Sequence, residues 1–282
     1  MTTPHLGLHI RHHTGFTYEG LAKSSYNEAR MTPVSSTHQD VLATSIAVTP
    51  SVATATYVDY FATVVTAFDL QENHSQLEVE ARSSVTSRAA TLENAVAWEE
   101  LRSPTIADRL SEFLFATNRT RLSGESLELI ELWRGLSDVH ECAEAVSEFV
   151  RSRVDYVPGA TTVSSTAQEA WERGEGVCQD ITHITIGLLR EVGVPTRYVS
   201  GYFFPPRDAD VGAVVDGQSH AWVEYFSGTW TGIDPTNASR ETERHIIVGR
   251  GRDYDDVAPL KGIYHGPASS SLGVIVEMRR TD

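Results

Sequence analysis

Cysteine is scarce in this chain, with 2 among 282 residues. Two thiols form at most one bridge, which excludes a fold stapled by several disulfides. The N-terminus has no basic leader followed by an apolar block, so we expect no secretion signal and a cytoplasmic protein. In that reducing compartment Cys142 and Cys178 are predicted to be free thiols.

Long hydrophobic runs and an excess of positive charge are also missing. No stretch reaches the roughly 18 apolar residues that a bilayer span needs, so a membrane is not an expected partner. The chain has 23 Lys and Arg against 38 Asp and Glu, a net charge of −15. That charge repels phosphate backbones and anionic lipid head groups, so we expect no nucleic acid partner either.

Short alternating segments fill the first third of the chain. Apolar residues recur with a period of two in LGLHIRHHTGFTY, VLATSIAVTP, ATYVDYFATVVTAFDL and SQLEVEARSSV. This period predicts strands, because successive side chains of a strand point to opposite faces. We therefore expect an all-β, sandwich-like domain over residues 1–88, with residues 86–104 as the connecting segment.

The apolar period changes after residue 105. IADRLSEFLFAT, SGESLELIELWRGL and VHECAEAVSEFVRSRV place apolar residues three and four apart, as amphipathic helices do. Strand-like segments follow at 194–204, 220–226, 229–234 and 271–278. Helices followed by strands predict an α+β second domain over residues 105–282. The segment from Pro205 to Gly217 is expected to be a surface loop.

Cys178 stands out because of its neighbours in GEGVCQDITHITIGLLREVG, residues 174–193. Gly174 and Gly176 allow a sharp turn, after which Cys178 falls near the first turn of an apolar helix. Unpaired N–H groups and the helix dipole there favour a thiolate, which is the nucleophilic form of cysteine. On this segment alone a small buried hydrophobe is the commoner explanation.

The rest of the chain offers a base and a group to orient it. His220 begins an alternating strand 42 residues after Cys178, and Asp234 follows 14 residues later. A hairpin with a three-residue loop at 226–228 sets Asp234 directly across from His220, on the same face of the sheet. A cysteine, an imidazole and a carboxylate in contact form the arrangement of nucleophilic catalysis.

Four motifs in the second half carry a family resemblance. GEGVCQD, GVPTRYVSGY, SHAWVE and WTGIDPTN occur in that order and resemble the bacterial transglutaminase-like family. GRDYDDVAPLKG, residues 251–262, is similar to the stretch that follows in that family. In the front part, YNEARMTP, VTP and DYF resemble the β-rich domain that precedes the core in many such bacterial proteins. Here Ala62 and Thr63 follow DYF, where family members usually have Gly-Asn.

The resemblance implies a papain-like cysteine-protease architecture for the second domain. It also implies that Cys178 is the nucleophile, His220 the general base and acid, and Asp234 the group that orients His220. The implied reaction is attack on an amide through a thioester, most simply a hydrolytic one on a protein or peptide substrate, by a peptidase or deamidase. Amine transfer, and a binding scaffold with an inactive site, are the alternatives.

No cofactor is implied, and no metal site is expected. Asp180 and His183 lie one helical step apart, but no third ligand accompanies them, so His183 is predicted to be a satisfied core histidine. Tyr156 offers a second oxyanion donor, although plain packing explains it more simply. Trp222 shares the strand face of His220, where it walls a cleft or fills the sheet core. Cys142 fits an inert helix position.

Overall fold

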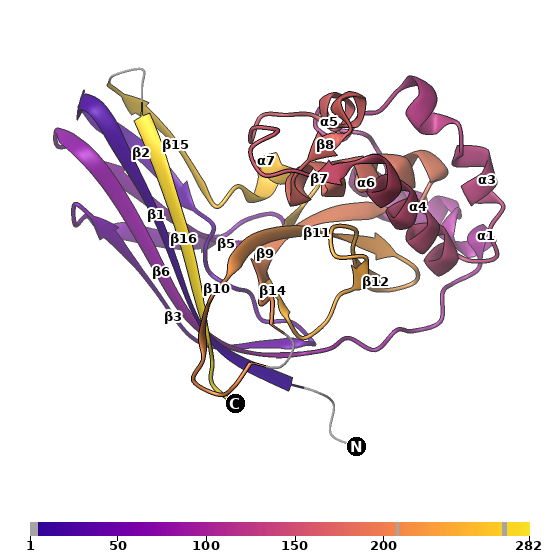
Figure 1. The fold of residues 1–282 in the computed structure, drawn as a ribbon, viewed down its shortest axis with the longest axis horizontal. Coiled ribbons are helices and arrows are strands. Elements are labelled where there is room, and N and C mark those ends of the chain that lie inside the picture. Colours follow the sequence, from indigo (N-terminus) through magenta and orange to yellow (C-terminus); the bar gives the residue numbers. More distant parts are fainter. Residues whose placement is uncertain (1–4, 207–208, 267–269) are drawn as a thin grey trace.

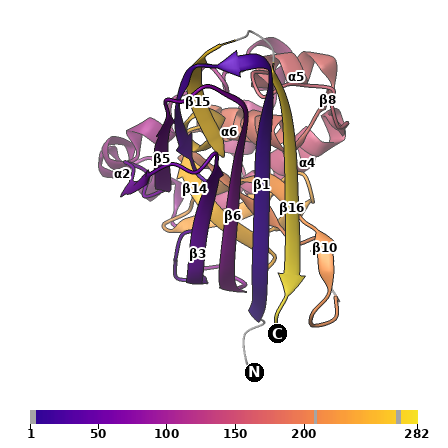
Figure 2. The same cartoon turned by 90° about the vertical axis from the view of Figure 1, so that its left-hand side faces the viewer.

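The computed structural model describes residues 5–206, 209–266 and 270–282, and it has the predicted α+β fold built on antiparallel sheets (Figure 1). The first sheet consists of five strands in the order β10-β16-β1-β6-β3. Their bounds are Val214–Asp216 for β10, Ser270–Arg280 for β16, His5–Ala22 for β1, His74–Arg88 for β6 and Gln39–Thr49 for β3. Figure 2 shows the four long strands side by side.

The second sheet packs on one part of the first sheet and forms the predicted β sandwich with it. Its strand order is β15-β2-β5-β4, with β15 at Leu260–His265, β2 at Ser24–Ala29, β5 at Val64–Leu70 and β4 at Thr54–Val58. A cluster of buried side chains fills the space between the two sheets, including Tyr18, Met31, Phe68, Leu77 and Val79. The period-two apolar pattern of β1 and β6 supplies this core.

The third sheet and the helices make up the other half of the molecule. The strand order is β13-β12-β11-β9-β14, at Ser239–Arg240, Trp230–Asp234, Gln218–Phe226, Thr196–Phe203 and His245–Gly251. The helices are α1 (Trp98–Leu101), α2 (Pro104–Arg109), α3 (Ile130–Arg134), α4 (Val139–Arg153), α5 (Ala167–Arg173), α6 (Cys178–Val192) and α7 (Tyr254–Val257). Short elements complete the fold: η1 (Ser111–Phe113), η2 (Gly124–Leu127), β7 (Asp155–Tyr156) and β8 (Glu175–Gly176).

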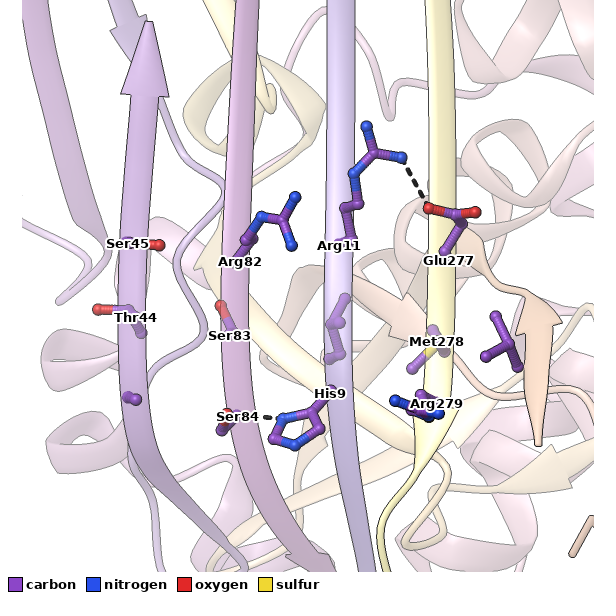
Figure 3. A pocket seen from close by; sticks show the side chains of 13 residues that line it. His9, Arg11, Thr44, Ser45, Arg82, Ser83, Ser84, Glu277, Met278 and Arg279 are labelled. Atoms are coloured by element: carbon purple, nitrogen blue, oxygen red, sulfur yellow. Dashed lines mark hydrogen bonds and ion pairs between the residues drawn. The ribbon is translucent and has the colours of Figure 1, made fainter. Parts of the chain in front are cut away.

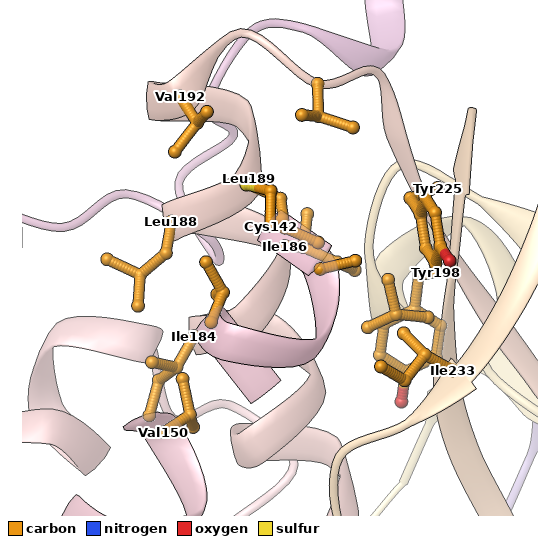
Figure 4. Close-up of a cluster of buried hydrophobic side chains, with 14 of the residues drawn as sticks. Cys142, Val150, Ile184, Ile186, Leu188, Leu189, Val192, Tyr198, Tyr225 and Ile233 are labelled. Carbon is orange, nitrogen blue, oxygen red and sulfur yellow. The ribbon is translucent and has the colours of Figure 1, made fainter. Parts of the chain in front are cut away.

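Helix α6 is the centre of this second core. It is buried along most of its length between α4, α5 and the strand β11. Figure 4 shows Ile184, Ile186 and Leu189 of α6 packed with Cys142 of α4 and Tyr225 of β11. A glycine with a positive φ of 101°, Gly193, ends the helix in the left-handed conformation. This packing fixes the position of the N-terminus of α6, where Cys178 lies.

Alternate side chains of β1 point to the same face of the first sheet. Along the strand, this face passes through three different environments. Leu6, Leu8 and Ile10 pack against the third sheet, together with Met278 of β16. At the other end Tyr18 packs in the sandwich core. The middle of the face, from residue 12 to residue 16, lies between these two cores.

Two features differ from the sequence prediction. The prediction assigned residues 105–282 to the second domain, but β16 pairs with β1 in the first sheet and β15 pairs with β2 in the second. Within the predicted loop 205–217, residues 207 and 208 lie outside the described residues, and Val214–Asp216 forms β10. These strands are stabilised by backbone partners far away in sequence, which a local pattern does not reveal.

The turn after DYF keeps its conformation without the usual glycine. Ala62 has a positive φ of 63°, and its N–H donates to the Asp59 carbonyl at 3.0 Å. The Asp59 carboxylate accepts from the N–H groups of Phe61 and Thr63, both at 3.0 Å. These three bonds hold a residue with a Cβ in a region that favours glycine.

Candidate active site

The N-terminus of α6 presents Cys178 beside a short parallel bridge between β7 and β8. Gly174 ends α5 with a φ of +70°, and a Cβ at Gly176 would come within 2.8 Å of the Asp180 Cβ. Asp180 Oδ2 accepts from the Val177 N–H at 2.8 Å and from the Thr161 hydroxyl at 2.6 Å. Asp180 therefore caps the helix, and the two glycines permit the close turn before Cys178, as predicted.

Strand β11 brings His220 to the same place. Its Nε2 lies 2.7 Å from Asp234 Oδ2 on β12, and both side chains are buried. The predicted register was wrong by two residues, because Phe226 pairs with Trp230 and the loop is 227–229. Asp234 is therefore diagonal to His220, not directly across from it. A shift by two keeps both side chains on one face of the sheet, so the contact is preserved.

The Asp234 carboxylate accepts five hydrogen bonds. Oδ2 receives His220 Nε2, His245 Nε2 at 3.0 Å and Asn237 Nδ2 at 2.7 Å. Oδ1 receives the backbone N–H groups of Thr236 and Asn237 at 3.0 and 3.1 Å. Burial by itself would raise the pKa of Asp234, but these charge-assisted bonds outweigh it and hold the pKa well below its usual range. The group is a fixed negative charge.

His245, on β14, holds that charge in place. Its Nδ1 accepts from the Thr242 N–H at 3.1 Å, so in the neutral ring the proton lies on Nε2 and is donated to Asp234. Burial lowers the pKa of His245 and keeps the ring neutral.

His220, Asp234 and His245 are close enough to one another to suggest three ligands of a metal ion. The proton on His245 Nε2 occupies the lone pair that a metal would need. The arrangement thus fits a hydrogen-bond network better than a metal centre.

The imidazole of His220 connects Asp234 to the sulfur. Burial would lower the pKa of His220, but the bonds to Asp234 and to the Cys178 side chain raise it to about 10. Because Nε2 faces Asp234, Nδ1 is the nitrogen available to Cys178. The site therefore favours an imidazolium next to the sulfur.

A cleft of about 270 Å³ opens onto Cys178 and His220. One wall comes from the α6 region and the third sheet, through Val163, Gln179, Tyr198, Ser200 and Ala221. The opposite wall is the middle part of the first sheet, with His12, Thr14, Phe16, Leu272 and Val274. The sulfur lies where the two halves of the molecule meet.

Comparison with known proteins gives consistent matches over both halves. Residues 8–86 match the bacterial transglutaminase-like N-terminal region, and residues 130–235 match the transglutaminase-like superfamily. An uncharacterised protein of Mycobacterium leprae is 43% identical over 277 residues, covering 97% of this chain and 98% of its own. The chain belongs to the transglutaminase-like superfamily. An uncharacterised protein of Mycobacterium tuberculosis is 29% identical over 307 residues, covering 96% of this chain and 93% of its own.

The fold of this transglutaminase-like protein also has a solved counterpart. A crystal structure named "putative cysteine protease", from Cytophaga hutchinsonii, superposes with a TM-score of 0.77 at 19% identity. The similarity covers 99% of this chain and 92% of the other. At that identity the comparison supports the papain-like fold with its preceding β-rich region, and nothing finer.

The other residues singled out in this transglutaminase-like sequence have simpler positions. His183 is fully buried and its Nε2 accepts from the Tyr254 N–H at 3.1 Å, with burial lowering its pKa to about 3. Tyr156 is 52% exposed, and Cys142 is buried in α4, where burial raises its pKa to about 12. Trp222 is fully buried against the His220 ring, with centroids 6.1 Å apart, and does not line the cleft.

Sequence reasoning missed two residues of the site. His245 and Asn237 both donate to Asp234, yet neither belongs to a spaced pair that a pattern would single out. Asn237 lies three residues after Asp234 in WTGIDPTN, so an Asx turn was the available signal. His245 reaches Asp234 only because β14 lies beside β9 in the third sheet.

Among the described helices, none combines the length and the apolar run that a membrane span requires.

Proposed function

We propose that this protein is a cysteine enzyme that breaks amide bonds by acyl transfer to Cys178, with water as the usual acceptor and a protein or peptide as substrate. The observation that supports this most directly is the chain of contacts at the site. Cys178 interacts with His220, and His220 bonds to Asp234 at 2.7 Å. Family membership supports such chemistry, and the geometry of the site supports a separate role for each of the three side chains.

In the first half of the reaction the Cys178 thiolate attacks the amide carbonyl. A C–S bond forms while the C=O electrons move onto oxygen. The backbone N–H of Cys178, at the first position of α6, has no acceptor within the helix and is available to that oxyanion. His220 then gives its proton to the amide nitrogen, the C–N bond breaks, the amine leaves, and a thioester remains.

In the second half neutral His220 takes a proton from an incoming water. The water oxygen bonds to the thioester carbonyl and the C–S bond breaks. The carboxylic acid product leaves, and the thiolate and protonated His220 are regenerated. Asp234 stays ionised throughout, because its five donors stabilise the carboxylate, and its part is to orient and charge-stabilise His220. A primary amine in place of water gives transfer instead of hydrolysis.

Thiol labelling tests the nucleophile. Iodoacetamide should alkylate Cys178 at neutral pH much faster than Cys142, because Cys178 borders the cleft beside an imidazolium and Cys142 is buried with a raised pKa. Peptide mapping by mass spectrometry gives both rates in one sample. Equal slow labelling of the two residues would favour the inactive scaffold.

Mass spectrometry of the products separates the enzymatic alternatives. A glutamine-containing peptide is incubated with the protein and an excess of primary amine, with Cys178→Ala as the control. The mass gain of an amide-to-acid conversion means that water is the acceptor, cleavage of the peptide means peptidase action, and incorporation of the amine means transfer. Identical products from the alanine variant would refute the role of the sulfur.

A further inference from the structure

The cleft wall opposite Cys178 is part of an apolar sheet face that the protein leaves uncovered. On β16, Val276 and Met278 are 7% and 0% exposed because they pack against the third sheet. Leu272 and Val274 continue the same face toward the sandwich, but they are 55% and 48% exposed. Leu272 pairs with Phe16 of β1, which lines the cleft with them. The gap between the two cores of the first sheet is therefore the space above the sulfur.

Apart from the reacting pair, Cys178 and His220, this cleft carries no charged side chain. Asp, Glu, Lys and Arg make up 22% of the chain, so about four would be expected among the 17 described residues that line it, and there are none. Its polar groups are His12, Thr14, Gln179, Ser200 and Ser219, together with the reacting pair and the hydroxyls of two tyrosines. A charged group that enters loses water, and no lining residue outside the reacting pair offers it an opposite charge.

The other face of the same strands is charged. Figure 3 shows Arg11 and Arg279 there, with Arg11 bonded to Glu277 at 2.7 Å and His9 to Ser84 at 2.8 Å. The alternation along β1 and β16 thus separates a charged outer face from an uncharged inner one. The uncharged lining is a property of this face and not of the strands as a whole.

We infer that the half-buried Phe16 and the exposed Leu272 and Val274 form the specificity wall of the enzyme, and that this wall selects an uncharged, apolar side chain on the acyl side of the attacked amide. An acyl group joined to Cys178 must occupy the space that the sulfur borders, and that space is this cleft. About 270 Å³ accommodates one large aliphatic or aromatic side chain with its adjoining backbone. The inference rests on the proposed nucleophile and adds the substrate class.

Acyl-side probes test the inference without a known substrate. The chloromethyl ketones of N-acetylated leucine, glutamine, glutamate and lysine each alkylate a reactive thiol, with a new C–S bond and loss of chloride. Each rate on the whole protein is divided by the iodoacetamide rate of the same sample. The leucine probe should react about tenfold or more faster than the glutamate and lysine probes. Glutamine is close in size to glutamate, so the ratio of their rates isolates the effect of charge.

A positive charge introduced on the wall should shift the selectivity toward the acidic probe. Leu272→Lys should raise the ratio of glutamate to glutamine reaction by about tenfold, because the new ammonium compensates the carboxylate in a partly water-excluded space. Ile275→Lys is the matched control: Ile275 is also 55% exposed and lies on the same strand, but it points to the outer face. This variant should leave all ratios unchanged. Circular dichroism shows that each variant is folded, and the division by each variant's own iodoacetamide rate removes any change in the basal reactivity of Cys178.

Failure of the inference differs from failure of the proposed function. If iodoacetamide labels Cys178 no faster than Cys142, the nucleophile itself is refuted. If iodoacetamide labelling is fast but the four probes react at equal normalised rates, the specificity wall is refuted. Equal effects of Leu272→Lys and Ile275→Lys would refute it as well, because the change would then depend on net charge and not on the cleft.

Discussion

Replacing Asp234 by asparagine is the sharpest single test of the site. Asparagine keeps an oxygen where Oδ1 accepts the two backbone N–H groups, but it places an NH₂ group where Oδ2 accepts three donors. His220 and Asn237 can adapt by a tautomer change or an amide flip. His245 cannot, because its Nδ1 already accepts from the Thr242 N–H. The variant therefore sets two donors against each other in a buried site.

The structure gives the size of the effect. Raising the pKa of His220 from 6.5 to about 10 corresponds to about 5 kcal/mol in favour of the imidazolium, shared between Asp234 and Cys178 after the opposing cost of burial. A raised pKa stabilises the fold fully below about 6.5, and the contribution disappears as the pH rises through about 10. Asp234→Asn should lower the free energy of unfolding by about 3 to 5 kcal/mol at pH 6 and by less at pH 10.

The same change should slow the sulfur chemistry. Without the carboxylate the imidazolium is no longer favoured, so alkylation of Cys178 at pH 6 should fall by about 10²- to 10⁴-fold, the upper figure being that for the corresponding carboxylate in a serine protease. Urea unfolding at the two pH values measures stability, and timed iodoacetamide labelling measures reactivity. Asp138→Asn, at the cap of α4, is the control because asparagine caps as well as aspartate. Wild-type labelling and an unchanged urea midpoint in Asp234→Asn would refute this account.

Three further predictions concern stability. Glu224→Gln removes the buried carboxylate to which Arg197 and Arg250 both bond, and should lower the free energy of unfolding by about 3 kcal/mol near pH 7. Burial opposes ionisation of Glu224, yet the two arginines lower its pKa to about 2, so in the wild type this contribution fades as the pH falls from about 4.5. A pH series of urea midpoints that matches the wild type would contradict this. Asp180→Ala removes the side chain that caps α6 and should lower the free energy of unfolding by about 1 to 2 kcal/mol. An unchanged midpoint of urea unfolding would mean that water replaces the cap. Ala62→Gly should stabilise the protein by up to about 1 kcal/mol, since the φ of 63° favours glycine, and a lower melting temperature would argue against strain at that turn.

Much of the secondary structure of this protein can be predicted from local sequence. The period of two in residues 5–88 and the period of three and four after residue 105 predict strands and then helices, because each pattern puts apolar side chains on one face of its own element. Gly174 and Gly176, just before Cys178, predict the turn into α6, again from local sequence. The bonds that form it, such as Asp180 to Val177, join residues three apart.

The hairpin shows where local reasoning reaches its limit. Gly228 has the positive φ of 107° that hairpin loops commonly require, but turn chemistry did not show the two-residue difference in pairing. Phe226 continues the strand because its N–H donates to the Pro195 carbonyl at 2.9 Å and its ring joins the core. Pro195 lies about 30 residues before Phe226, so the turn residues alone could not fix the register. The face of Asp234 was still predictable, because side chains alternate with a period of two.

The sequence by itself therefore predicted the elements that hold Cys178, His220 and Asp234, since helices and strands depend largely on contacts between near neighbours. Only the tertiary structure decided what surrounds the sulfur. His245 reaches Asp234 across the third sheet, and the first and last strands of the chain meet to form the cleft wall, with Phe16 paired to Leu272. Contacts between residues more than 250 positions apart leave no local pattern, because their stability comes from packing between whole elements and not from the residues beside them in the chain.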